Sequence, residues 1–73
     1  MKARPPLERL AFIARRLRAG KGVNATIVAA RFEVSSKTAA RDITFLGDRL
    51  RYDFAWDNRR NTYRLLSAPA PVL

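Results

Sequence analysis

The 73-residue chain is short and strongly basic, and it lacks the two residue types that build most metal and nucleophilic sites. It carries 15 Lys and Arg against 6 Asp and Glu, a formal net charge of +9, with no Cys and no His. These counts exclude disulfides, zinc held by thiolate or imidazole, and catalytic Cys-His or Ser-His-Asp groups. The length allows one small domain, in which we expect no enzymatic activity, no cofactor and no metal.

The first predicted element is a helix that begins at Pro5 and Pro6 and ends before Gly20. One apolar stripe at helical spacing comprises Leu7, Leu10, Ile13, Ala14 and Leu17. The opposite, solvent-directed face comprises Glu8, Arg9, Phe12, Arg15 and Arg16. Phe12 is the one aromatic on that face, and it is either a contact for a partner or an isolated surface aromatic.

A second helix is predicted after a turn and a very short strand at residues 21–23. Asn24 is a good N-cap for this helix, which runs to Phe32. Residues 33–34 then make a turn, and Ser35 can cap a third helix by accepting a hydrogen bond from a first-turn amide. These elements together have the layout of a helix-turn-helix.

The third helix is predicted to run to about Leu50 and to separate apolar from polar residues. Its buried face comprises Ala39, Ile43, Leu46 and Leu50. Its outward face comprises Lys37, Arg41 and Thr44. Asp42 follows Arg41 on the same helix, so we interpret this acid as the acceptor of a structural hydrogen bond or ion pair, not as a catalytic group.

From Arg51 the apolar period changes to two, which is typical of half-buried strands. The aromatic positions of the first strand are Tyr52, Phe54 and Trp56. A polar turn, DNRRN at residues 57–61, separates it from a second strand at residues 62–65. The hairpin would form a wing with Arg59 and Arg60 at its tip. We expect one domain over residues 1–66 and a proline-containing tail or linker over residues 67–73.

The sequence VSSKTAARDITFLGDRL at residues 34–50 carries a family resemblance. With the order of elements around it, it resembles the DeoR-type winged helix-turn-helix found at the N-terminus of bacterial WYL-domain transcriptional regulators. The matching residues are Ser35, Thr38, Arg41, Asp42, Ile43 and Leu46. Glu33 departs from the glycine usual in the turn, and Ala39 replaces a larger aliphatic. The implied fold is α+β, with three helices, a short strand and a two-stranded wing.

This resemblance implies sequence-specific binding of double-stranded DNA by a cytoplasmic, nucleoid-associated bacterial regulator, most often a repressor. The third helix, about residues 36–49, would enter the major groove, and the 57–61 wing tip would lie on the backbone or in the minor groove. The predicted DNA contacts are Ser35, Ser36, Lys37, Thr38, Arg41, Thr44, Arg59 and Arg60. Lys2 and Arg4 would add nonspecific attraction. A homodimer would form through regions absent from this chain.

The arginine content favours a polyanion independently, because 12 of the 15 basic residues are Arg and a guanidinium matches phosphate oxygens and the guanine edge. Two alternatives remain open. One is RNA or single-strand binding, with Tyr52, Phe54 and Trp56 as a stacking platform, although alternation on a small sheet is more often core. The other is a basic amphipathic first helix that docks on a membrane surface or an acidic protein. No apolar run approaches the roughly 20 residues of a membrane span.

Overall fold

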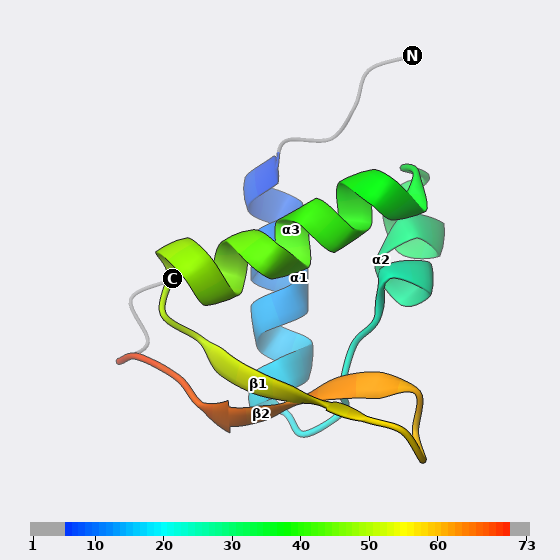
Figure 1. The fold of residues 1–73 in the computed structure, drawn as a ribbon. Helices are drawn as coiled ribbons and strands as arrows, with labels where there is room; N and C mark the ends of the chain where they lie inside the picture. Colours follow the sequence, from blue (N-terminus) through cyan, green and yellow to red (C-terminus); the bar gives the residue numbers. More distant parts are fainter. Residues whose placement is uncertain (1–5, 71–73) are drawn as a thin grey trace.

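The computed structural model describes residues 6–70 of the chain (Figure 1). Within that range the elements are α1 (Pro6–Arg18), α2 (Ala25–Phe32), α3 (Ser36–Arg49), β1 (Asp53–Asp57) and β2 (Thr62–Ser67). The fold of the described residues is therefore α+β, with three helices followed by an antiparallel hairpin, which is the element order of a winged helix. The helix boundaries agree with those predicted, and β2 continues past the predicted end at Leu65 to Ser67.

Polar side chains start both helices of the helix-turn-helix, as predicted. The Asn24 side chain accepts a hydrogen bond from the Ile27 amide at 2.8 Å, and Ser35 Oγ accepts one from the Thr38 amide at 3.0 Å. Between them Glu33 has φ 57° and ψ 45°, the left-handed conformation. A residue with a Cβ adopts that conformation at a cost of about 1–2 kcal/mol, so the packing of α2 against α3 must hold this turn in place.

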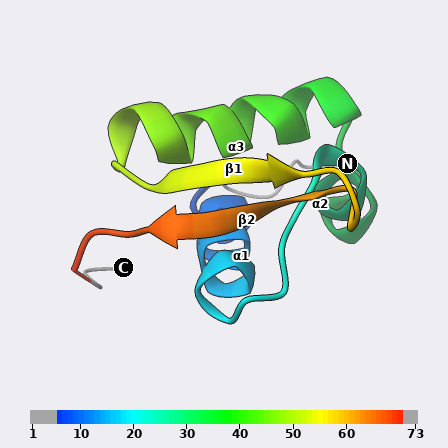
Figure 2. The same cartoon turned by 60° about the horizontal axis from the view of Figure 1, so that its bottom comes forward.

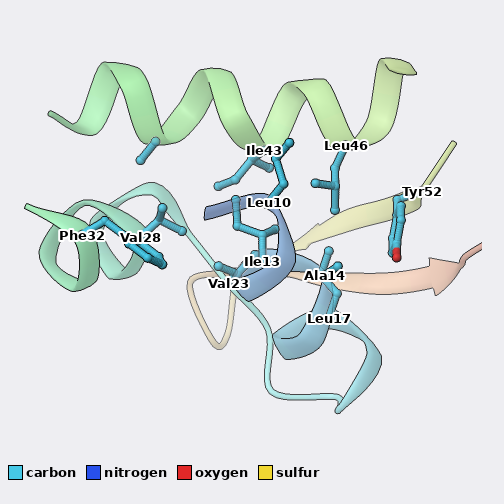
Figure 3. Close-up of a cluster of buried hydrophobic side chains, with 11 residues drawn as sticks. Leu10, Ile13, Ala14, Leu17, Val23, Val28, Phe32, Ile43, Leu46 and Tyr52 are labelled. Atoms are coloured by element: carbon cyan, nitrogen blue, oxygen red, sulfur yellow. The ribbon is translucent and has the colours of Figure 1, made fainter. Parts of the chain in front are cut away.

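The core lies where α1, α2, α3 and the start of the hairpin converge (Figure 3). Its most completely buried side chains are Ile13, Leu17, Val23, Val28 and Leu46. On α3 the predicted buried spacing is confirmed, since Ala39, Ile43 and Leu46 are buried and Leu50, at the C-cap, is half-buried.

The predicted faces of α1 were wrong at three positions. Leu7 is 62% exposed, because the buried face of α1 begins only at Arg9. Arg9, expected in solvent, is 6% exposed and forms an ion pair with Asp42 where α3 packs on α1. Phe12 is half-buried, with its ring edge-on to Phe32 of α2 at 5.4 Å between centroids. Phe12 therefore packs on Phe32 within the fold and is not an isolated surface aromatic.

The hairpin is joined to the helical part through Val23. Val23 and Tyr63 form an isolated antiparallel bridge, with Val23 N donating to Tyr63 O at 3.2 Å and Tyr63 N to Val23 O at 2.7 Å. This bridge confirms the very short strand predicted at residues 21–23. Gly22 allows the close approach, because its φ is +75° and a Cβ there would lie 2.5 Å from Thr62 Oγ1.

The elements leave one side of α3 uncovered. Figure 2 shows α3 running along the top of the molecule, with the hairpin and α1 below it and α2 beneath its N-terminal end. In both views the hairpin turn lies at the same end of the molecule as the N-terminus of α3 (Figures 1 and 2). Figure 1 nevertheless separates the two, because the hairpin turn lies at the bottom right and the N-terminus of α3 at the upper right, beside α2.

Candidate nucleic-acid interface

The outer face of α3 carries the predicted base-reading side chains. Lys37, Arg41 and Thr44 are all exposed, on the side of the helix opposite the buried Ala39, Ile43 and Leu46. Within residues 6–70 no hydrogen bond or ion pair engages the side chains of Lys37 or Arg41. Their charged groups are therefore available to an external partner.

An acidic residue marks the far end of this face. Asp48 is exposed one helical turn beyond Thr44, so it continues the stripe that begins at Lys37. A carboxylate repels phosphate, although it can accept a hydrogen bond from cytosine N4. The positive part of the outer face is therefore its N-terminal half. The sequence did not predict that Asp48 ends the positive stretch.

The hydroxyl groups at the start of α3 have different surroundings. Ser35 Oγ, besides capping the helix, donates a hydrogen bond to Thr38 Oγ1 at 3.1 Å. Ser36 is exposed and Thr38 is half-buried. Ser36 thus has an exposed hydroxyl without a hydrogen bond among the described residues, while Ser35 and Thr38 already satisfy part of their hydrogen-bonding capacity within the helix.

The hairpin turn presents two exposed arginines. The Asp57 carboxylate shapes this turn by accepting the backbone N–H groups of Arg59 at 3.0 Å and Arg60 at 3.3 Å. Asn61 completes it in the left-handed conformation, φ 60°, with its N–H on Asp57 O at 2.8 Å. Both guanidinium groups stand on a turn whose backbone is fixed by these bonds. Lys2 and Arg4 lie outside the described residues.

Asp42 has the structural role predicted for it but a different partner. Its carboxylate accepts the Arg9 Nε–H of α1, and the side chains are 7% (Arg9) and 11% (Asp42) exposed. Consecutive helical residues point about 100° apart, so Arg41 faces solvent while Asp42 faces α1. The pair ties α3 to α1 and leaves Arg41 free.

The three aromatics of the hairpin do not form one exposed platform. Tyr52 is 5% exposed and belongs to the core, and Phe54 is half-buried against Tyr63. Trp56, by contrast, is 45% exposed. The prediction of core is therefore confirmed for Tyr52 and wrong for Trp56, which lies near the hairpin turn, where the helices give less cover.

Trp56 opens onto a groove that the sequence did not reveal. The groove has a volume of about 350 Å³ and is formed by the start of α2, the middle of α3 and the hairpin. Its lining residues are Asn24, Ala25, Thr26, Ala40, Ile43, Trp56, Asn61 and Tyr63. Because these residues come from three separate segments, no local pattern could have identified them together.

Other kinds of site find no support in the described range. Residues 6–70 contain no cluster of three or more Asp, Glu, His or Cys placed to hold a metal ion. None of the helices in that range combines the length and apolarity that a bilayer crossing demands. No protein-family model, curated protein or solved structure matches this chain.

Proposed function

We propose that this protein binds double-stranded DNA in a sequence-dependent way, as a bacterial transcription regulator. The outer face of α3 carries the proposal, because Lys37 and Arg41 stand exposed and unpaired on a helix whose opposite face is fully packed. An α-helix fits the major groove, and a guanidinium there can bind guanine O6 and N7 in a bidentate manner.

The roles of the other polar residues follow from their positions. Ser36 and the wing-tip residues Arg59 and Arg60 are suited to phosphate contacts, which fix the register of a protein on DNA but read no sequence. Thr38 and Ser35 support the first turn, and Thr44 faces the base edges beside Arg41. The resemblance to DeoR-type winged helices of WYL-domain regulators adds repression, a cytoplasmic location and dimerisation through other regions to the proposal.

The test is selection of bound sequences from a random duplex library, followed by Arg41→Ala on the selected site. Loss of one bidentate base contact should weaken binding to the selected duplex by about 1–3 kcal/mol. It should also narrow the difference in affinity between the selected duplex and random duplex. Arg15→Ala is the matched control, because Arg15 is equally charged and exposed but lies on α1, away from the outer face of α3.

Two results would contradict the proposal. The first is the absence of any enriched sequence after selection. The second is full retention of discrimination between selected and random duplex by Arg41→Ala, which would remove α3 as the reading element.

A further inference from the structure

Trp56 is an exposed aromatic that is nevertheless held in one orientation. Its indole N–H donates to Asn58 Oδ1 at 3.0 Å, and its ring meets the Tyr63 ring edge-on at 4.9 Å between centroids. Since the polar N–H is already engaged, the 45% of the residue that remains exposed presents mainly the ring to an external partner. An aromatic side chain whose orientation is already fixed in this way loses little conformational entropy on binding.

The groove beside Trp56 is neutral, although the surface around it is basic. None of its lining residues is charged, and Thr26 and Asn61 are its exposed polar members. Asn24 Nδ2 donates to Asn61 O at 2.8 Å, which joins the start of α2 to the hairpin turn and fixes the groove's width at that end. A neutral, part-apolar groove suits an apolar part of a ligand, with Thr26 and Asn61 available to polar groups at its edge.

The groove also lies between the two regions that the proposed function places on DNA. On α3 the lining residue Ala40 directly precedes Arg41, and on the hairpin the lining residue Asn61 directly follows Arg60. The groove is therefore bordered on both sides by residues that the proposed function places on DNA. Each strand alternates phosphates with deoxyriboses, whose ring faces are apolar.

We infer that this groove seats one sugar–phosphate strand of the duplex, with the Trp56 indole packed against a deoxyribose and the Thr26 hydroxyl donating to the adjoining phosphate. This inference rests on the proposed function and adds a contact surface to it. A sugar contact carries no base information. Trp56 therefore contributes affinity, while Lys37 and Arg41 contribute discrimination.

The experiment compares Trp56→Ala with wild-type protein on the selected duplex, on random duplex and on single strands. We expect about tenfold weaker binding to both duplexes, an unchanged ratio between them, and partial recovery in Trp56→Phe. Leu66→Ala is the control, because Leu66 is a 50% exposed apolar residue near the other end of the hairpin. The affinity of this variant for duplex should stay within about twofold of that of the wild-type protein.

A second measurement needs no variant. Trp56 is the only tryptophan of the chain, so its fluorescence reports on this groove alone. Addition of duplex should change the emission with the same midpoint as binding measured by mobility shift. This arm decides the inference if Trp56→Ala fails to fold.

The outcomes separate the groove from the function. Suppose that Arg41→Ala weakens duplex binding, Trp56→Ala does not, and the Trp56 emission of wild-type protein does not change when duplex is added. The inference about the groove is then overturned and the proposed function stands. If Trp56→Ala weakens single-strand binding more than duplex binding, base stacking replaces the sugar contact and the inference is overturned. If wild-type protein binds no duplex, both are overturned.

Discussion

Helices α1 and α3 are both amphipathic and both carry several cations, yet these cations are used differently. On α1, Arg9 is buried with Asp42, Arg16 Nε donates to Gly22 O at 2.8 Å, and Arg18 donates to the Tyr52 hydroxyl at 3.1 Å. On α3, Lys37 and Arg41 have no partner within the described part of the chain.

The difference shows that a surplus of positive charge does not by itself locate an interface. The long side chain and several donors of an arginine let it bond to distant carbonyl and hydroxyl groups, so α1 uses this residue type to hold the fold together. Under the proposed function, the unpaired cations on the outer face of α3 are the ones placed to release counterions from DNA. The contrast between paired and unpaired arginines can be tested variant by variant.

The largest effect is expected at Arg9. Arg9→Ala leaves the Asp42 carboxylate buried without its partner, which should lower the free energy of unfolding by about 3–5 kcal/mol. Urea denaturation measures this, with Arg15→Ala as a control expected within about 0.5 kcal/mol of wild type. A loss below about 1 kcal/mol would mean that the pair behaves like a surface ion pair.

An intermediate effect is expected from paired substitutions that remove equal charge. Lys37→Ala/Arg41→Ala should weaken binding to the selected duplex at least about tenfold at fixed salt, because the proposed function places both cations at the base edges. Arg15→Ala/Lys21→Ala removes the same charge from α1 and the turn after it, and should change affinity by no more than about twofold. Fluorescence anisotropy with labelled duplex measures the affinity of both double variants. Equal losses of affinity in the two would show that only the net charge of the protein matters for binding.

The smallest effect is expected at Arg18, whose side chain also donates to Pro69 O at 2.8 Å and lies over the Tyr52 ring. Arg18→Ala should cost about 1 kcal/mol of stability, as exposed hydrogen bonds of this kind contribute little each. Duplex affinity below the melting temperature should stay the same. Thermal denaturation and anisotropy on the same sample test this, and a loss of affinity without a loss of stability would place Arg18 in the interface.

The sequence predicted most of what depends on neighbouring residues. The N-caps at Asn24 and Ser35, the buried spacing of α3 and the exposure of Lys37, Arg41 and Thr44 all follow from periodicity and short-range hydrogen bonding. Even the departure at Glu33 could be read locally, because this turn requires a left-handed residue whether or not glycine supplies it.

The features that the sequence did not predict depend on contacts between distant segments. Arg9 and Asp42 are 33 positions apart, and on its own helix Arg9 has the pattern of a solvent-facing residue. The exposure of Trp56 likewise depends on how far α1 and α3 extend over the sheet, which alternation within one strand does not report. The groove could be predicted only if the relative positions of α2, α3 and the hairpin were already known.

The bridge between Val23 and Tyr63 has a consequence for the order of folding. It closes a loop that contains α2, α3 and β1, so the chain must lose considerable entropy before this pair of hydrogen bonds can form. Helical turns form from near neighbours and precede such a contact. The hairpin should therefore join the helices as a late step of folding.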